Sequence, residues 1–202
     1  MKLCILSLPQ FFEQEALALS TLLQQGGFRL HLRKPGASPQ ELASLLEQID
    51  PIYWSRIVLH DAFELVKDYP VGGLHLNQRN PQAPPSFRGS ISCSCHNWDE
   101  VQANKSSCDY LFISPIFNSI SKPNYARAFS QDELEEAQQT EWVDSHVIAL
   151  GGITARRIPS LRALGFGGVA VLAAIWGDYM KCFSTSDLRH SLHSIITEIE
   201  AK

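Results

Sequence analysis

The stretch that decides the fold is Asp109-Tyr-Leu-Phe-Ile-Ser-Pro-Ile-Phe-Asn-Ser-Ile-Ser-Lys122. Its first half is a short apolar run, rich in aromatic and β-branched residues, that ends before Pro115, and this pattern is typical of a buried parallel strand. Its second half is polar and indicates a loop. Parallel α/β folds bind ligands at the carboxyl ends of their strands, where Ser119, Ser121 and Lys122 would offer two hydroxyls and a cation. The stretch therefore predicts an anion site, with phosphate favoured, although Ser and Lys are also common in solvated loops.

The composition indicates a single domain over residues 1–202. The chain is 45% hydrophobic, enough to bury one sizeable core. Its formal net charge is -4 with both signs scattered, which argues against nucleic acid or an anionic membrane as partner. No stretch approaches the length of a membrane span. We expect small-molecule ligands, and the apolar helix faces of such a chain allow a homodimer.

The five cysteines and the N-terminus indicate a cytoplasmic protein. The N-terminal apolar run ends at Pro9, which is too early for a secretory signal. An odd number of cysteines without Cys-x-x-Cys spacing argues against a disulfide framework or a zinc ribbon. The thiols are Cys4, Cys93, Cys95, Cys108 and Cys182, and we expect them to be reduced.

Strand and helix patterns alternate along the whole chain. We expect helices at 11–25, 38–49, 62–67, 97–103, 130–139, 154–164 and 187–200, two of them opened by the capping boxes Ser38-Pro39-Gln40-Glu41 and Ser130-Gln131-Asp132-Glu133. The strand patterns cover 2–8, 28–33, 57–61, 72–77, 89–96, 109–114, 146–150 and 167–173. Three prolines within 80–87 exclude an ordinary helix after the fourth strand. The alternation predicts a single-domain (β/α)₈ TIM barrel with an abbreviated fourth crossover, and an open doubly wound sheet is the alternative.

The strand at 89–96 has one polar face. Ser90, Ser92, Ser94 and His96 alternate with apolar residues, so their side chains share a side that suits a wet or ligand-filled interior. An imidazole at the end of this face is a candidate for proton transfer near neutral pH. A histidine that caps the following helix is an equally good interpretation of His96.

Two turns near the C-terminus predict a phosphate site. Gly151 and Gly152 follow the seventh strand, and the small residues Ala173 and Ala174 follow the eighth. In barrels these two loops commonly bind phosphate through backbone N–H groups. The glycines are also compatible with a tight turn that has no ligand.

Four histidines and two cations fall near the carboxyl ends of the predicted strands. His31, His60, His75 and His96, together with Asp61, could form the zinc site of a hydrolase. The absence of a His-x-His pair makes hydrogen-bonded structural histidines the stronger interpretation. Arg33 and Lys122 suit carboxylate or phosphate groups.

These motifs, in their order along the chain, resemble those of thiamine-phosphate synthases and of their thiazole tautomerase paralogues. The resemblance covers nearly the whole chain and is most specific in the opening stretch and in the Gly-Gly-Ile that ends the seventh strand. The matching segments are His31-Leu32-Arg33, His60-Asp61, Gly73-Leu74-His75-Leu76-Asn77-Gln78, Ser94-Cys95-His96, Asp109 to Lys122 and Ile148-Ala149-Leu150-Gly151-Gly152-Ile153.

The resemblance to the synthases implies Mg²⁺ chemistry on a pyrimidine pyrophosphate, which needs paired carboxylates and several cations. Asp61 would be the remaining metal ligand of such a synthase. The chain departs from the synthase pattern at four positions. His31 replaces a Gln, Pro35 a Lys, His60 an Asn, and Asn80 the second metal-binding Asp.

The resemblance to the tautomerases implies isomerisation of a thiazole carboxylate phosphate with no cofactor. His96 would move the proton, Arg33 and Lys122 would hold anionic groups, and His31, His60 and Ser94 would line the substrate site. The phosphate would be held by Ser119, Ser121, Gly151, Gly152, Leu172 and Ala173. We predict a thiazole tautomerase. The alternatives are a synthase that uses Mg²⁺ and a catalytically silent binding or regulatory protein of the thiamine pathway.

Overall fold

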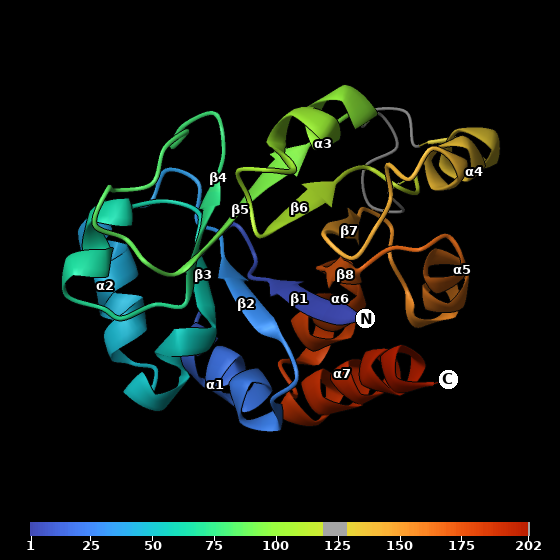
Figure 1. Cartoon of the computed structure of the whole chain (residues 1–202). Coiled ribbons are helices and arrows are strands. Elements are labelled where there is room, and N and C mark those ends of the chain that lie inside the picture. Colours follow the sequence, from blue (N-terminus) through green and yellow to red (C-terminus); the bar gives the residue numbers. More distant parts are fainter. Residues whose placement is uncertain (119–128, 202) are drawn as a thin grey trace.

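Eight short parallel strands form a closed barrel in the computed structural model, which describes residues 1–118 and 129–201 (Figure 1). Each strand pairs with the next along the chain, and the eighth pairs with the first. The strands are β1 (Lys2–Leu6), β2 (Arg29–Leu32), β3 (Ile57–Leu59), β4 (Gly73–Leu76), β5 (Ser90–Cys95), β6 (Tyr110–Ile113), β7 (Val147–Leu150) and β8 (Gly168–Val171). The predicted (β/α)₈ barrel is confirmed, and the open doubly wound sheet is excluded.

Helices surround the barrel on its outside (Figure 1). The α-helices are α1 (Glu15–Gln25), α2 (Pro39–Glu47), α3 (Trp98–Asn104), α4 (Gln131–Gln139), α5 (Ile158–Ala163), α6 (Ala173–Cys182) and α7 (Thr185–Glu200), and the 3₁₀ turns are η1 (Pro51–Arg56), η2 (Phe63–Lys67) and η3 (Ala155–Arg157). The described residues between β4 and β5 form no helix, as the three prolines predict.

The alternation of each strand sorts its side chains into two layers. On β2, Leu30 and Leu32 are buried in the large cluster between the sheet and the helices, whereas His31 lies inside the barrel, where it contacts Phe112. The barrel interior holds a second, smaller cluster of Cys4, Leu6, Tyr110, Phe112, Ile148 and Ala170. On β5, Cys93 and Cys95 belong to the outer cluster, and this leaves Ser92 and Ser94 to face inward. The interior is therefore apolar on one side and polar on the other.

Both predicted capping boxes are present. The Glu41 backbone N–H donates to Ser38 Oγ at 3.2 Å, and the Ser38 N–H donates to Glu41 Oε2 at 2.8 Å. At the start of α4, the corresponding bonds between Ser130 and Glu133 measure 3.2 and 2.6 Å. These caps begin their helices at Pro39 and Gln131, within a residue of the predicted positions.

The structure differs from the sequence prediction at three helices. Residues 62–67 form a 3₁₀ turn, and the helix expected from Phe11 starts at Glu15, because Gln14 has a left-handed φ of 61°. Ala173 and Ala174, expected in a turn, open the additional helix α6. This helix buries Ile175, Trp176 and Tyr179, and its Trp176 indole N–H donates to the Leu6 carbonyl at 2.7 Å.

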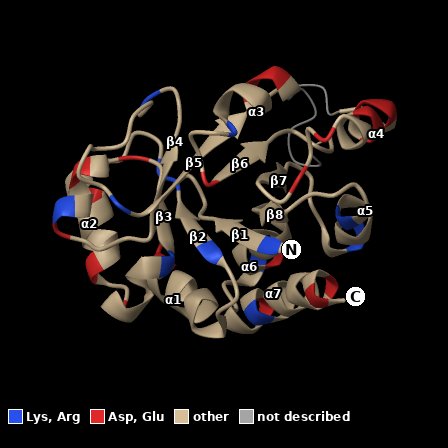
Figure 2. Ribbon diagram, in the orientation of Figure 1, with Lys and Arg blue, Asp and Glu red and all other residues tan. Residues whose placement is uncertain are grey.

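Charges of both signs are distributed around the barrel, in keeping with the net charge of -4 (Figure 2). None of the described helices has the length and apolar composition needed to cross a membrane.

Candidate active site at the carboxyl ends of the strands

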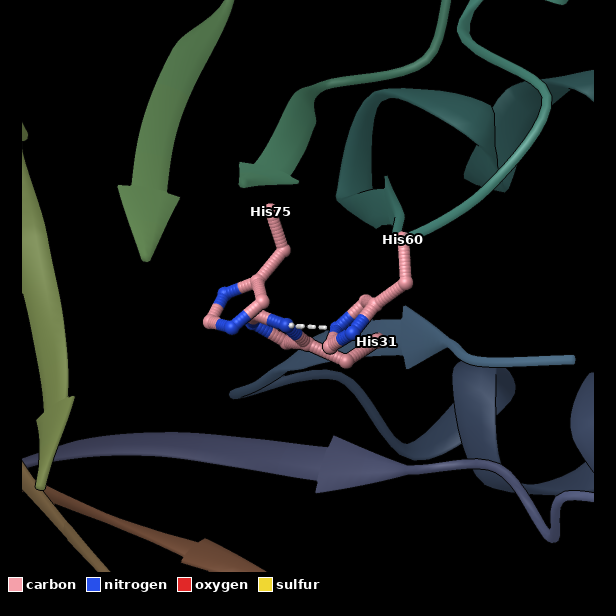
Figure 3. Close-up of side chains that lie close together, drawn as sticks. All are labelled: His31, His60 and His75. Carbon is pink, nitrogen blue, oxygen red and sulfur yellow. Dashed lines mark hydrogen bonds between the residues drawn. The ribbon is translucent and has the colours of Figure 1, made fainter. Parts of the chain in front are cut away.

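Three histidines from consecutive strands meet inside the barrel (Figure 3). His31 lies on β2, His60 directly follows β3, and His75 lies on β4; all three side chains are buried. His31 Nδ1 and His60 Nε2 share a hydrogen bond of 2.9 Å, and His31 Nε2 shares one of 3.0 Å with the Tyr110 hydroxyl. The imidazole of His31 therefore has both nitrogens occupied.

The serine face of β5 holds the third ring. His75 Nδ1 lies 2.8 Å from Ser92 Oγ, and His75 Nε2 lies 2.8 Å from Ser94 Oγ. The His60 and His75 rings stack with their centroids 4.1 Å apart and an interplanar angle of 18°. Hydrogen bonds and stacking thus join β2, β3, β4 and β5 across the interior, and the polar face predicted for β5 is in contact with this network.

Burial keeps the three imidazoles neutral at physiological pH. Desolvation lowers the pKa of His31 and His60 well below the usual value, and the neighbouring His75 lowers both further. Desolvation, with a smaller contribution from the Arg33 charge, lowers the pKa of His75 to about 3. Neutral imidazoles can both donate and accept, as the observed network requires.

The stacking of His60 on His75 argues against a shared metal ion. An imidazole binds a metal close to its own ring plane, and two nearly parallel stacked rings leave no position near both planes for a shared ion. Zinc would also have to break the hydrogen bonds of His31 and His75, although the nitrogens of the three rings lie within 4.8 Å of one another. The geometry favours a hydrogen-bonded network over the zinc site of a hydrolase.

Next to this network, the carboxylate of Asp61 is paired with an arginine that the sequence analysis missed. Arg79 donates from Nε at 3.0 Å and from Nη2 at 2.9 Å to Asp61 Oδ1. The amide of Asn80 donates to the same oxygen at 3.4 Å. Asp61 Oδ2 is buried and has no hydrogen-bond partner among the described residues. The only sequence signal for Arg79 is its place beside Asn80, in a turn where the chain departs from the synthase pattern.

His96 lies at the mouth of the barrel and not in its interior. Its side chain is 62% exposed, and Nδ1 lies 3.3 Å from Glu100 Oε2, which also accepts the His96 backbone N–H at 2.8 Å. A carboxylate can only accept, so Nδ1 carries the proton and Nε2 is left as the basic atom. This arrangement is compatible with both predicted roles, the helix cap and the proton carrier.

The turn after β7 packs closely against the end of β6. Gly151 and Gly152 have φ angles of +102° and +64°. A Cβ at Gly151 would lie 2.9 Å from Pro115 Cα, and one at Gly152 would lie 2.9 Å from Phe117 Cβ. These contacts alone account for the two glycines. The guanidinium of Arg157, also missed in the sequence, lies over the Phe117 ring at 4.3 Å and donates to the Gly152 carbonyl at 2.6 Å.

Helix α6 adds backbone donors on the phosphate side. Leu172 and Ala173 stand where β8 passes into α6, and the first-turn N–H groups of Ala173 and Ala174 have no acceptor among the described residues. A helix N-terminus beside the β8 loop is a common phosphate site in barrels. Ser119, Ser121 and Lys122 lie outside the described residues.

Arg33 and Ser94 stand at the same end of the barrel. Arg33 is half-buried just beyond β2, where its backbone N–H donates to Ser7 Oγ at 2.9 Å. Ser94 is half-buried next to the end of β5. A cavity of about 360 Å³ lies instead at the opposite mouth, among residues that begin strands, such as Lys2, Arg29 and Tyr110. The described part of the predicted site is thus built from strand ends and turns.

A closed parallel barrel with polar groups at the carboxyl ends of its strands is the architecture of (β/α)₈ enzymes, whose active sites lie at that end. Within this class, the chain belongs to the thiamine monophosphate synthase family, whose model matches residues 4–175. It is an enzyme of thiamine biosynthesis.

Individual relatives agree with this assignment. The chain is 29% identical to the putative thiamine-phosphate synthase of Geobacter sulfurreducens over 76% of each chain, and 29% identical to the thiamine-phosphate synthase of Herpetosiphon aurantiacus over 80% of this chain and 82% of that one. The crystal structure of thiamine phosphate pyrophosphorylase from Bacteroides thetaiotaomicron superposes with a TM-score of 0.87, at 34% identity and full coverage of both chains. The family and the fold predicted from the sequence are confirmed.

The described residues do not fit the Mg²⁺ ion that the synthase resemblance implies. Asp61 is the one carboxylate present, and Arg79 already neutralises it. The position of the second carboxylate holds Asn80, whose amide nitrogen also donates to the Asp61 carboxylate. Mg²⁺ requires oxygen ligands with room for several bound waters, and the free Asp61 oxygen is buried.

Proposed function

We propose that this enzyme binds a thiazole phosphate and isomerises the thiazole carboxylate phosphate to its aromatic form by acid–base catalysis. The pairing of Asp61 with Arg79 carries the proposal, because it removes the paired carboxylates that a Mg²⁺-assisted pyrophosphate reaction needs. The tight turn at Gly151 and Gly152 and the N-terminus of α6 support a phosphate site at this end of the barrel. An isomerisation needs only a proton carrier and an anion clamp, for which His96 and these backbone groups are the candidates.

Each predicted residue has a role in this reaction. His96 Nε2 takes a proton from one ring position and returns it at another, while Glu100 holds the ring through Nδ1. Arg33 and Lys122 hold the anionic groups of the substrate. Ser94 contacts the substrate, with His31 and His60 beneath it. The phosphate is held by Ser119, Ser121, Gly151, Gly152, Leu172 and Ala173.

His96→Ala is expected to lower the rate of isomerisation about a hundredfold or more, because a positioned acid–base group contributes at least that factor. Affinity for the thiazole phosphate product, measured by calorimetry, is expected to stay unchanged. His146→Ala is the matched control, since His146 is 51% exposed and pairs with Asp144 at 3.4 Å, yet directly precedes β7 at the opposite mouth. Turnover that is equally high in both variants would contradict the role of His96.

A synthase is the second candidate, because the relatives reported above carry that name. A paired assay separates the two activities: isomerisation of the thiazole carboxylate phosphate with EDTA, and coupling of thiazole phosphate to pyrimidine pyrophosphate with Mg²⁺. We expect turnover in the first assay alone. Turnover in the second that EDTA abolishes would identify a synthase. Silence in both, with thiazole phosphate still bound, would identify a binding protein of the pathway.

A further inference from the structure

We propose that Arg79 is a built-in cation that takes the place of a metal ion beside Asp61, so that this site excludes Mg²⁺ and selects substrates that carry no metal-bound pyrophosphate. Binding of a divalent cation at Asp61 can be measured without the isomerase activity proposed above.

The ion pair is well formed and partly shielded from solvent. Both Nε and Nη2 of Arg79 point at Asp61 Oδ1, at 3.0 and 2.9 Å, and the Asp61 side chain is only 10% exposed. Charge-assisted hydrogen bonds of this length are strong, and only the Asp61 side of the pair is shielded from water, since the Arg79 side chain is 49% exposed. The carboxylate and the guanidinium together carry no net charge, so the pair lacks the negative charge that draws a divalent cation.

The turn that carries Arg79 is folded onto the end of β3 by its own asparagines. The Asn77 side chain accepts the backbone N–H groups of Arg79 and Asn80 at 3.0 and 3.2 Å. It also donates to the His60 carbonyl at 2.7 Å, and Asn80 donates to the same carbonyl at 3.2 Å. These bonds hold Arg79 against Asp61 without any ligand, which is the preorganisation expected of a resident cation.

A metal ion at Asp61 would have to compete with the N–H groups that already donate to its Oδ1 atom. Oδ1 of Asp61 already accepts from Arg79 and from the Asn80 amide. Oδ2 is buried, so the waters that Mg²⁺ retains cannot reach it unless the residues that cover it move. Binding would therefore require Arg79 to leave, at the cost of its two charge-assisted hydrogen bonds to Asp61. Asn80, in place of a carboxylate, provides no compensating charge.

Mn²⁺, a spectroscopic substitute for Mg²⁺, tests this proposal without an activity assay. Titrations followed by electron paramagnetic resonance should give the same weak Mn²⁺ binding for the wild type and for Asp61→Asn. The double variant Arg79→Gln with Asn80→Asp restores two carboxylates and removes the cation, so it should bind Mn²⁺ about tenfold or more tightly than the wild type. Addition of Asp61→Asn should abolish that gain.

The control is Arg88→Gln in the same crossover, because the Arg88 side chain is exposed and its acceptors among the described residues are the carbonyls of Pro85 and Phe87. It should leave Mn²⁺ binding unchanged. Tight binding by the wild type that Asp61→Asn removes would overturn the proposal. Absence of any gain in the folded double variant would also overturn it, because something other than Arg79 and Asn80 would then exclude the ion.

A measurement on the wild type covers the case in which the double variant does not fold. The ¹⁵N-labelled Arg79 Nε–H resonance should stay in place when MgCl₂ is added, since the ion pair remains closed. Its displacement by Mg²⁺ would show the metal entering and would overturn the proposal. The resonance does not depend on isomerase activity, so an inactive enzyme with an undisplaced resonance would contradict the proposed function and leave the role of Arg79 standing.

Discussion

A fall in pH from about 7.5 to about 5.5 should reduce the free energy of unfolding by about 4 kcal/mol, because three buried histidines stay neutral in the fold and become protonated only in the unfolded chain. The three are His31, His60 and His75, which lie inside the barrel in mutual contact. Few single changes of solution conditions should affect this protein as strongly.

The direction follows from the pKa differences. Burial lowers the pKa of each of these histidines below its usual value, to about 3 for His75. A group with a depressed pKa in the folded state contributes full stability above its unfolded pKa of about 6.5 and loses it as the pH falls below that value, at up to about 1.4 kcal/mol per pH unit. The charges of Arg29, Arg33 and Arg79 add to the penalty for protonating the network.

Denaturant unfolding at a series of pH values measures this loss. His75→Asn removes one titrating ring, and its amide can still bond to the serines of β5, so the decline of stability with pH should become about one third less steep. His193→Asn, on the exposed side of α7, should leave the steepness unchanged. Identical slopes for the wild type and His75→Asn would show that the network does not titrate in this way.

The barrel could be predicted because its determinants are local in the sequence. Alternation on β5 correctly placed Ser92 and Ser94 on the inner side, since neighbouring residues of a strand point to opposite faces. The two capping boxes likewise depend on residues three apart. Helix α6 escaped prediction because its buried residues, Ile175, Trp176 and Tyr179, occupy only one and a half turns and surround a glycine.

The partners of the charged groups could not be predicted, because they depend on turns and on long-range packing. Arg79 reaches Asp61 only because asparagine side chains fold the 77–80 turn onto β3. His75 lies inside the barrel between two serines of β5, a contact across strands that no local pattern indicates. The strand alternation does not extend to His96, because β5 ends at Cys95 and the His96 ring contacts Glu100 instead.

Lys34 and Glu15 form a second long-range ion pair, which is buried and which no sequence pattern predicts. Lys34 is inaccessible to solvent and Glu15 is 3% exposed, with Lys34 Nζ 2.5 Å from Glu15 Oε1. The ammonium also donates to the carbonyls of Leu8 and Gln10, both at 2.8 Å. Burial lowers the pKa of Lys34 and raises that of Glu15, so each charge depends on the other for its compensation. The bridge ties the β1–α1 loop to the segment after β2.

Lys34→Met is therefore expected to destabilise the fold by about 3–5 kcal/mol, because it leaves the Glu15 carboxylate buried without a partner. Adding Glu15→Gln to this variant should recover part of the loss, since an amide costs less to bury than a charge. The matched control is Lys181→Met, whose lysine is 75% exposed and pairs with Asp178 at 2.7 Å on α6; its effect should stay within about 0.5 kcal/mol.

Urea unfolding of the four proteins at neutral pH decides between two views of the buried bridge. If the charge of Glu15 causes the loss, the double variant must be more stable than Lys34→Met alone, and lowering the pH must narrow the gap as Glu15 becomes protonated. If instead the carbonyls of Leu8 and Gln10 cause it, by losing their donor, the double variant would recover nothing and the gap would be independent of pH.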